Sequence, residues 1–368
     1  MAKREIDPRL QALYDKGASV YSYSKLSTIH DCPYGSYLTY IQKSPQVQNV
    51  YSYLGGITHD VLEDIIEGKA ELSDIKPTLE KGLDELDMLG INFPKTRDGG
   101  TGIRDRWVAN MITCLGRDYT SPKGKFEVEK LLILKINEMR YLQGYADLIR
   151  VLDDGSVQVL DLKTSSQFQE KDLLHYGRQL VAYAMALEQA GIKVRGAAWI
   201  MLKYVKVSYM AKRRKTDKEM QLISKVCDRC KLAMTIKAVA RAKMYDAGYS
   251  EDQIDDVIER FLITNDIKDL PDEISSQFDV KTYVRPYDIT DEKRQECLDF
   301  INETADQFEE MQQTRNWPHK PVTDKYGQAD FFCTNLCGHR KNCPYLKEVM
   351  DLTGGFNKSK KCGLDELF

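Results

Sequence analysis

Two acidic side chains and a lysine interrupt apolar runs in the middle of this sequence. The stretch GYADLIRVLDDGSVQVLDLKTSSQ (144–167) places Asp147 and Asp161 in strand-like segments, and Lys163 follows two residues after the second acid. A charged group without a partner is expensive to remove from water, so buried β-structure seldom contains one. The three side chains are therefore the first candidates for chemistry.

The segment between the two acids predicts how they are arranged. We expect residues 153–155, Asp-Asp-Gly, to form a three-residue hairpin loop. This register places Asp147 directly opposite Asp161, with Cβ atoms about 5 Å apart, and Lys163 on the same face. Opposed carboxylates repel each other unless a cation lies between them, and Mg²⁺ prefers carboxylate oxygens. The alternative is an edge hairpin whose acids only face solvent.

Three further polar side chains extend the candidate set. His59 lies on an apolar helical face in GGITHDVLEDIIEG, where a histidine is more often a hydrogen-bonded core residue than a ligand. Gln179 and Tyr183 lie four residues apart on one face of the helix that we expect at 172–189. In chain order the set reads His, Asp, Asp-x-Lys and Gln-x-x-x-Tyr.

This ordered set resembles the RecB-like branch of the PD-(D/E)xK nuclease superfamily. The likeness begins at SYSKLSTIHDCPYGSYLTY (22–40) and continues through LGGITHDVLE, GYAD, VLDLKTSSQ and QLVAYAMAL, in the family's order. These motifs extend over roughly half of the chain. The second motif is Gly-Tyr-Ala-Asp where the family name has Pro-Asp. The resemblance implies an α/β fold with a restriction-endonuclease-like core, in which helices flank a mixed central sheet, and a C-terminal cysteine-rich cluster loop. The expected helical insertions come from two stretches that match none of these motifs.

The resemblance also implies a role for each residue. Lys163 would orient or activate the attacking water and help to neutralise the charge that develops on the phosphate. Gln179 and Tyr183 would position the substrate strand or support the lysine. Phosphodiester hydrolysis needs a water of lowered pKa and a cation at the nonbridging oxygens, and a bound Mg²⁺ or Mn²⁺ supplies both. The implied metal ligands are one imidazole, two carboxylates and one backbone carbonyl: His59, Asp147, Asp161 and Leu162.

The cysteines point to a second metal site. Nine cysteines, an odd number, in a chain without a secretion signal argue against a disulfide framework. Three cysteines within eleven residues of FFCTNLCGHRKNCPYL (331–346) indicate a metal or a cluster. These three are Cys333, Cys337 and Cys343.

The iron–sulfur subset of RecB-like nucleases, which includes AddB-like and CRISPR-associated exonucleases, supplies the missing ligand by resemblance. It implies that Cys32 joins the three C-terminal cysteines around a structural [4Fe–4S] cluster. The first gap in C-x₃-C-x₅-C is one residue longer than is usual in that subset. Zinc is therefore the alternative occupant, with four thiolates or with His339 as a substitute ligand.

We expect a single elaborated nuclease domain over residues 1–368. Strand-like runs gather between helical segments, and the last segment is polar and rich in cysteine. The expected parts are a helical insertion at 65–117, the catalytic core sheet and helix at 125–207, a helical insertion at 210–279, the C-terminal helix and cysteine cluster at 280–346, and a flexible tail at 347–368.

Charge and hydropathy bear on partners and location. The formal net charge is −3, so binding of nucleic acid must use local basic patches. The stretch AKRRK (211–215) is a candidate phosphate-contacting loop, and an unpartnered basic loop is the alternative. Its basic residues are Lys212, Arg213, Arg214 and Lys215. With no apolar run that could span a bilayer and no signal sequence, we expect a cytoplasmic protein of a bacterium or a phage-infected cell, without a membrane partner.

A metal-dependent DNA exonuclease that acts on single-stranded ends is the function that the resemblance implies. Its size and organisation resemble phage recombination and repair nucleases. The alternatives are an endonuclease acting on DNA or RNA, and a cluster-bearing DNA-binding module with a vestigial nuclease site. The C-terminal segment Leu364–Phe368 resembles peptides that dock into apolar pockets of DNA sliding clamps, and a tail folded back onto the nuclease is the alternative.

Overall fold

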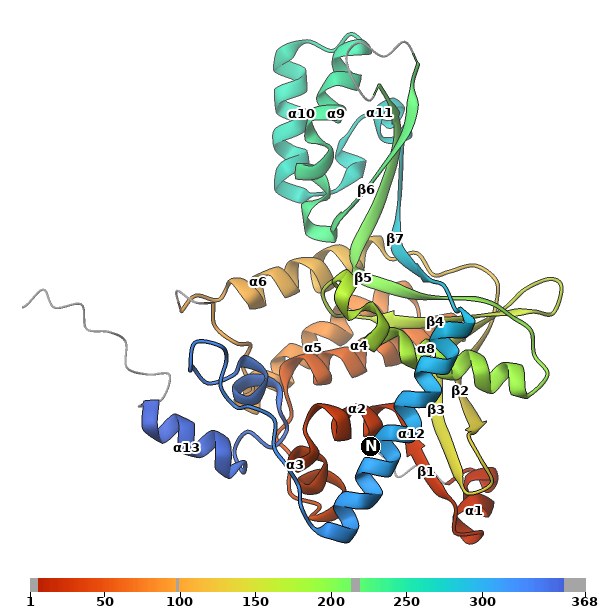
Figure 1. Cartoon of the computed structure of the whole chain (residues 1–368). Coiled ribbons are helices and arrows are strands. Elements are labelled where there is room, and N and C mark those ends of the chain that lie inside the picture. Colours follow the sequence, from red (N-terminus) through yellow and green to blue (C-terminus); the bar gives the residue numbers. More distant parts are fainter. Residues whose placement is uncertain (1–5, 97–98, 213–218, 354–368) are drawn as a thin grey trace, which may run out of the picture. The chain divides into compact units, whose positions relative to one another are not determined.

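The computed structural model describes residues 6–96, 99–212 and 219–353 (Figure 1). The chain divides into two compact units. Among the described residues, unit 1 comprises 6–52, 133–144 and 291–353, and unit 2 comprises 53–96, 99–132, 145–212 and 219–290. Helix α4 (Val50–Ile66) and strand β3 (Arg140–Val151) contribute residues to both units.

Unit 1 combines segments from the two ends of the sequence. Strand β1 pairs in parallel with the beginning of β3, from Ser19 opposite Arg140 to Ser22 opposite Gln143. The Ser22 side chain accepts a hydrogen bond from the Lys25 amide and thereby caps the start of the helix that follows β1. The other elements are α1 (Pro8–Asp15), β1 (Ser19–Ser22), α2 (Tyr23–Asp31), α3 (Pro33–Ser36), a π-helix at Tyr37–Ile41, α12 (Asp291–Thr314), a π-helix at Phe332–Leu336 and α13 (Pro344–Thr353).

The sheet of unit 2 is mixed, as expected for the α/β fold class. Strand β4 pairs antiparallel with β3 and parallel with β5, and β5 pairs antiparallel with both β6 and β7. The parallel β4–β5 pair needs a crossover, which helix α8 provides. Gly191 ends that crossover helix with a φ of +79°, a conformation that favours glycine. The strands are β2 (Lys125–Lys135), β3, β4 (Val157–Lys163), β5 (Val194–Ala211), β6 (Gln221–Asp228) and β7 (Phe278–Tyr287).

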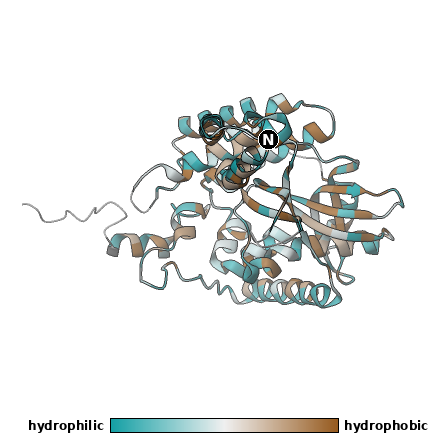
Figure 2. Cartoon of the chain, turned by 90° about the horizontal axis from the view of Figure 1, so that it is seen from above, coloured by the Kyte–Doolittle hydropathy of each residue, from teal (hydrophilic) through white to brown (hydrophobic). Residues whose placement is uncertain are grey.

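Helices flank this sheet. Both the strands and the helices carry hydrophobic and hydrophilic residues (Figure 2). The helices of unit 2 are α4, α5 (Ile75–Met88), α6 (Gly102–Val108), a π-helix at Ala109–Leu115, α7 (Gly116–Asp118), α8 (Leu173–Gln189), α9 (Leu232–Asp246), α10 (Glu251–Thr264) and α11 (Asp272–Ser275). Short 3-10 turns lie at Leu72–Asp74, Glu170–Asp172, Arg229–Lys231 and Ile267–Asp269. No helix among the described residues is both long and apolar enough to cross a membrane.

The segment 210–279 differs from the helical insertion that the sequence predicts, because it also contains strand β6. Leu222, Ile223, Val226 and Cys227 repeat in a pattern that also fits a helix, so periodicity alone does not distinguish the two. In the structure β6 pairs with the C-terminal part of β5, and this pairing favours a strand over a helix. Helices α9, α10 and α11 then pack on one side of β5, β6 and β7, around buried residues such as Val207, Ile236, Ile258 and Phe261 (Figure 1).

A glycine allows helix α8 to pack closely against β7. A Cβ atom on Gly177 would lie 2.1 Å from Cζ of Tyr287, whose ring is buried. We expect Gly177→Ala to lower the free energy of unfolding by about 1–3 kcal/mol, since the ring must shift. Thermal unfolding measures this loss. Gly196→Ala is the matched control, because a Cβ there meets no atom within 4 Å; equal melting temperatures for the two variants would contradict the expectation.

Candidate functional site

The two acids lie at the base of the expected hairpin. Pairs from Leu148 opposite Leu160 to Val151 opposite Val157 confirm the predicted register and the three-residue loop. Asp147 and Asp161 stand one position beyond the last of these pairs. Oδ2 of Asp147 accepts a hydrogen bond of 2.8 Å from the Leu162 amide. The Asp147 side chain therefore satisfies a backbone donor of β4, and its carboxylate is fixed beside the end of that strand.

Asp161 and Lys163 form an ion pair next to Asp147. Nζ of Lys163 lies 2.8 Å from Oδ2 of Asp161 and 3.1 Å from Oδ1, and the Asp161 side chain is only 5% exposed. Oδ2 of Asp161 is buried and lacks a hydrogen bond of normal geometry. Burial lowers the pKa of Lys163, but the charges of Asp161 and Asp147 outweigh it and raise the pKa overall. The lysine is therefore a fixed positive charge in this site.

The pKa of Asp147 lies above that of an ordinary surface carboxyl. Burial raises it, and the nearby charge of Asp161 raises it further. Two carboxylates beside one ammonium leave an excess of negative charge when both are ionised. A divalent cation would remove that repulsion, so the electrostatics favour a metal ion here.

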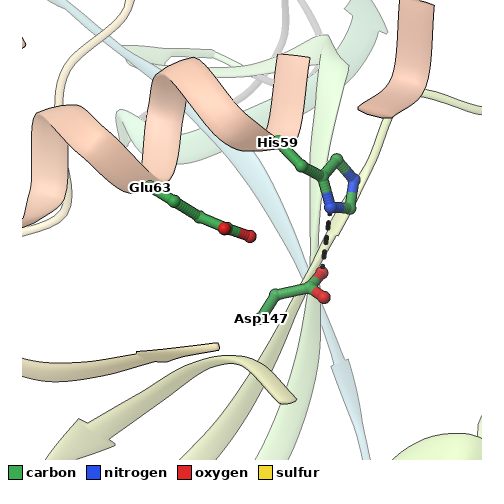
Figure 3. Close-up of side chains that lie close together, drawn as sticks. All are labelled: His59, Glu63 and Asp147. Atoms are coloured by element: carbon green, nitrogen blue, oxygen red, sulfur yellow. Dashed lines mark ion pairs between the residues drawn. The ribbon is translucent and has the colours of Figure 1, made fainter. Parts of the chain in front are cut away.

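Helix α4 brings a histidine to the same place. A Cβ atom on Gly55 would lie 3.3 Å from Oγ1 of Thr164, the residue after Lys163, so the glycine allows a close approach of the helix to β4. One turn later, Nδ1 of His59 lies 3.5 Å from Oδ2 of Asp147 (Figure 3). Burial lowers the pKa of His59, partly offset by the charge of Asp161. The neutral imidazole that this favours is the form that binds metals.

Glu63 is a candidate site residue that the sequence interpretation missed. It follows His59 by one helical turn and points toward Asp147 (Figure 3). Potential ligand atoms of His59, Glu63 and Asp147 all lie within 4.8 Å of one another. Glu63 is 7% exposed, and its carboxylate has no hydrogen-bond or ion-pair partner among the described residues. The spacing of four residues between His59 and Glu63 was the available signal, because it places both on one face of a helix.

These donors fit a divalent ion. An imidazole and two carboxylates converge, and the buried Asp161 carboxylate is close enough to influence the pKa values of His59 and Asp147. The Leu162 backbone, whose carbonyl the sequence interpretation named as a ligand, lies close enough to His59 to influence its pKa. Oxygen-rich donor sets of this kind suit Mg²⁺ or Mn²⁺.

Gln179 and Tyr183 meet on α8, as their spacing predicts. Nε2 of Gln179 donates a hydrogen bond of 3.1 Å to the Tyr183 hydroxyl. Burial raises the pKa of Tyr183 to about 12, and the charges of Asp161 and Asp147 contribute to the rise. The pair therefore lies beside the two acids, with the tyrosine as a neutral hydroxyl.

The four cysteines of the expected cluster all belong to unit 1, and all four are free thiols. Burial raises the pKa of Cys337, and the neighbouring thiols of Cys32 and Cys343 raise it further. Burial likewise raises the pKa of Cys333 to about 12, and Cys337 is one of the groups that contribute. The two ends of the described chain therefore bring these thiols into one neighbourhood.

Backbone amides point at two of the sulfurs. The Gly35 amide donates to Sγ of Cys32 at 3.3 Å, and the His339 amide donates to Sγ of Cys337 at 3.4 Å. Such donors stabilise thiolates and modulate metal–sulfur centres. His339 itself is buried, and its Nε2 lies 2.8 Å from Oγ1 of Thr39, which leaves only Nδ1 for a ligand. Four thiols, two of which accept hydrogen bonds from backbone amides, fit a thiolate-bound metal or cluster.

Two predicted contact regions lie wholly or partly outside the described residues. Lys212 is exposed where β5 has ended, whereas Arg213, Arg214 and Lys215 lie outside the described part of the chain. The segment Leu364–Phe368 also lies outside it. Both assignments stay predictions.

Replacing Glu63 tests the metal centre through two effects, one on the pH dependence of stability and one on the affinity for Mn²⁺. Burial, followed by the charges of Glu129 and Asp60, raises the pKa of Glu63 to about 7. Metal-free protein should therefore lose stability as the pH rises from about 5 to about 8, because the buried carboxyl must ionise. In Glu63→Gln we expect a smaller loss, because Asp147, whose pKa burial also raises, still ionises in this range. The Kd for Mn²⁺ should rise about tenfold to a hundredfold.

Thermal unfolding in chelator at both pH values and calorimetric titration with Mn²⁺ measure the two effects. Glu67→Gln is the control, since Glu67 is exposed and pairs with Lys69 at 2.5 Å. Wild-type Mn²⁺ affinity in Glu63→Gln would exclude Glu63 as a ligand.

Comparison with known families places this geometry in context. The family model of the PD-(D/E)XK nuclease superfamily matches residues 20–344. The match includes both acids, the lysine, the helix that holds His59 and Glu63, and the cysteines from Cys32 to Cys343. A comparison with curated proteins finds no match.

Proposed function

Because this chain belongs to the PD-(D/E)XK nuclease superfamily and is a metal-dependent nuclease, we propose that it hydrolyses single-stranded DNA from a free end. The observation that carries the proposal is the convergence of His59, Glu63 and Asp147 beside the Asp161–Lys163 ion pair. A binding module with a vestigial site would have no reason to keep mutually repelling acids, which cost stability without a cation. The enzyme reading is therefore favoured over that alternative.

Each residue has a part in this proposal. His59, Glu63, Asp147, Asp161 and the Leu162 carbonyl would hold Mg²⁺ or Mn²⁺. When bound, the ion would supply a Lewis acid at the phosphate and lower the pKa of a water. Lys163, a cation fixed by its ion pair, would orient the attacking water and offset charge that develops on the phosphate oxygens.

Gln179 and Tyr183 have a positioning role in this proposal. The Gln179 amide holds the Tyr183 hydroxyl at 3.1 Å. Tyr183 remains a neutral donor at physiological pH, since burial raises its pKa to about 12. We propose that this pair orients the substrate strand or the lysine. Neither residue would exchange a proton during hydrolysis.

Digestion of linear and circular single-stranded DNA tests the proposed function. In Mg²⁺ or Mn²⁺ we expect end-labelled linear strands to be shortened progressively and circular strands of the same sequence to survive. Loss of the circles would favour the endonuclease alternative, and RNA strands in the same assay test the remaining substrate class. No hydrolysis of any strand with either ion would contradict the proposal.

We also propose a [4Fe–4S] cluster at Cys32, Cys333, Cys337 and Cys343, which would put the protein in the iron–sulfur, RecB-like subset. The support is the shared neighbourhood of the thiols and the amides that donate to Cys32 and Cys337. The cluster would be structural, tying together chain segments that belong to opposite ends of the sequence. Zinc remains the alternative occupant, because four thiolates suit it equally.

Two further contacts complete the proposal. Lys212, Arg213, Arg214 and Lys215 would contact the DNA backbone, which makes affinity depend on salt. Leu364–Phe368 would engage a DNA sliding clamp, in keeping with an origin among phage recombination or repair nucleases. Both proposals rest on the sequence, since most of these residues lie outside the described part.

A further inference from the structure

Helix α8, which carries Gln179 and Tyr183, has a further tyrosine, Tyr176, on the same face. Tyr176 precedes Gln179 by three residues and Tyr183 by seven, so all three lie along one stripe of α8. Tyr183 is 6% exposed, whereas Tyr176 is 41% exposed. The stripe therefore runs from the buried carboxylates out to solvent within two turns of the helix.

The ring of Tyr176 packs against a stack of buried aromatic rings. Phe168 lies parallel to it, with ring centroids 4.2 Å apart and planes at 20°. Phe168 in turn contacts Trp199 edge-on at 5.0 Å, and Trp199 contacts Tyr287 at 5.0 Å. Among the described residues no second ring lies parallel to Tyr176, and its neighbour His175 meets it at 81°. One ring face is thus packed, and a large part of the side chain is left to solvent.

The loop that carries Phe168 is also fixed. The Arg285 guanidinium donates a hydrogen bond of 2.6 Å to the Phe168 carbonyl and another of 2.7 Å to the Glu170 carboxylate. The Gln167 amide donates to the Tyr204 hydroxyl at 3.3 Å. This loop begins directly after Lys163, so it joins the catalytic lysine to the aromatic stack. The Tyr176 phenol is close enough to Lys163 to influence its pKa.

We propose that Tyr176 is a stacking platform for one unpaired nucleobase of the substrate, next to the phosphate that is cleaved. The inference rests on the proposed function and deepens it. An exposed ring held in place by packing can stack on any base at little entropic cost. A single strand offers free base faces along its length, whereas the interior bases of a duplex are already stacked on both sides. Tyr176 would thereby favour single-stranded substrate.

The rival explanation is that Tyr176 only caps the aromatic core. A capping role predicts lower stability in Tyr176→Ala and no dependence on the presence of a base. A platform predicts a dependence on one particular base. Abasic substitution in the DNA separates the two, because it removes the base and leaves the phosphate backbone unchanged.

The experiment measures kcat/KM on short linear single strands with one abasic site placed, in turn, at each position near the cleaved end. For the wild type we expect one position to reduce kcat/KM about tenfold to a hundredfold. Tyr176→Ala should show the same reduction on the intact strand and no further loss at that abasic position. Tyr176→Phe should behave as the wild type, since it keeps the ring.

Tyr245→Ala is the matched control, because Tyr245 is 70% exposed on α9 and lies outside the site; its profile should equal that of the wild type. The platform would be overturned if the defect of Tyr176→Ala, relative to the wild type on the same strand, were as large on every abasic strand as on the intact strand. Full activity of Tyr176→Ala on intact strands, or a Tyr176→Phe variant as impaired as Tyr176→Ala, would also overturn it.

A binding measurement that needs no cleavage separates this inference from the proposed function. Ca²⁺ replaces Mg²⁺, and 2-aminopurine is placed at the sensitive position of the strand, or at each position in turn. We expect wild-type protein to quench the 2-aminopurine fluorescence and Tyr176→Ala to leave it unchanged. If the wild type cleaves no strand, the proposed function fails. Quenching that is lost in Tyr176→Ala would still support the platform, and identical quenching by both proteins would overturn it.

Discussion

Replacing Asp161 with asparagine should reduce the hydrolysis rate about a thousandfold or more, with the fold retained. The change preserves shape but removes the charge that pairs with Lys163 at 2.8 Å and the buried oxygen beside His59 and Asp147. Both the proposed metal affinity and the orientation of the lysine depend on that charge. Lys163→Ala should cause a loss of similar size. Single-turnover hydrolysis in Mn²⁺ measures the chemical step apart from product release.

The same hairpin provides the control. Asp154 lies at its tip, half exposed, and pairs with Arg195 at 2.7 Å. Asp154→Asn should therefore hydrolyse DNA at the wild-type rate. Circular dichroism must show folded protein for each variant, because removing one partner of a buried ion pair also costs stability. More than a tenth of the wild-type rate in Asp161→Asn would show that Asp161 is not part of the catalytic centre.

The hairpin was predictable because local chemistry determines it. Asp-Asp-Gly suits a three-residue loop, and Gly155 has a φ of +77°, which few other residues tolerate. Alternating apolar residues then determine which face each side chain occupies. The position of Asp147 opposite the end of β4 follows from those two facts. The hydrogen bond from its carboxylate to the Leu162 amide does not, since it depends on where the backbone ladder stops.

Other features depend on contacts between distant parts of the chain. Strand β6 forms where the apolar pattern also fits a helix, because its pairing partner β5 lies in a different segment. Glu63 becomes a site residue only when α4 approaches β4 closely at Gly55. Sequence spacing shows that His59 and Glu63 share a helix face, but it does not show which strand that face meets. The resemblance to a known family supplied His59 and left Glu63 out.

The cysteine site shows the same limit over the longest separation. Cys333, Cys337 and Cys343 are close in sequence and suggested a metal by themselves, whereas Cys32 entered only by resemblance. The structure places Cys32 in the same compact unit, where its sulfur accepts the Gly35 amide hydrogen bond. The His339 amide likewise donates to Cys337, so the loop is built around sulfur acceptors. Neither contact can be read from the spacing of the cysteines.

Protein purified without oxygen should be brown, absorb at about 400 nm and contain iron and sulfide, as expected for a thiolate-bound cluster. In Cys32→Ser we expect most of the absorbance and iron to be lost. The melting temperature should fall by about 10 °C or more, because binding energy at a site shared by distant segments contributes directly to folding. Absorption spectra, metal analysis and thermal unfolding measure these three effects on one preparation.

Cys297→Ser is the matched control, since Cys297 is buried in α12 of the same unit and lies outside the cysteine loop. It should keep the colour and the iron content even where it loses some stability, because a hydroxyl packs less well than a thiol in an apolar site. Iron content in Cys32→Ser equal to that of the wild type would exclude Cys32 as a ligand. Colourless wild-type protein with one zinc per chain would show that the four cysteines bind zinc and not a cluster. The lower melting temperature of Cys32→Ser would then measure the contribution of zinc to folding.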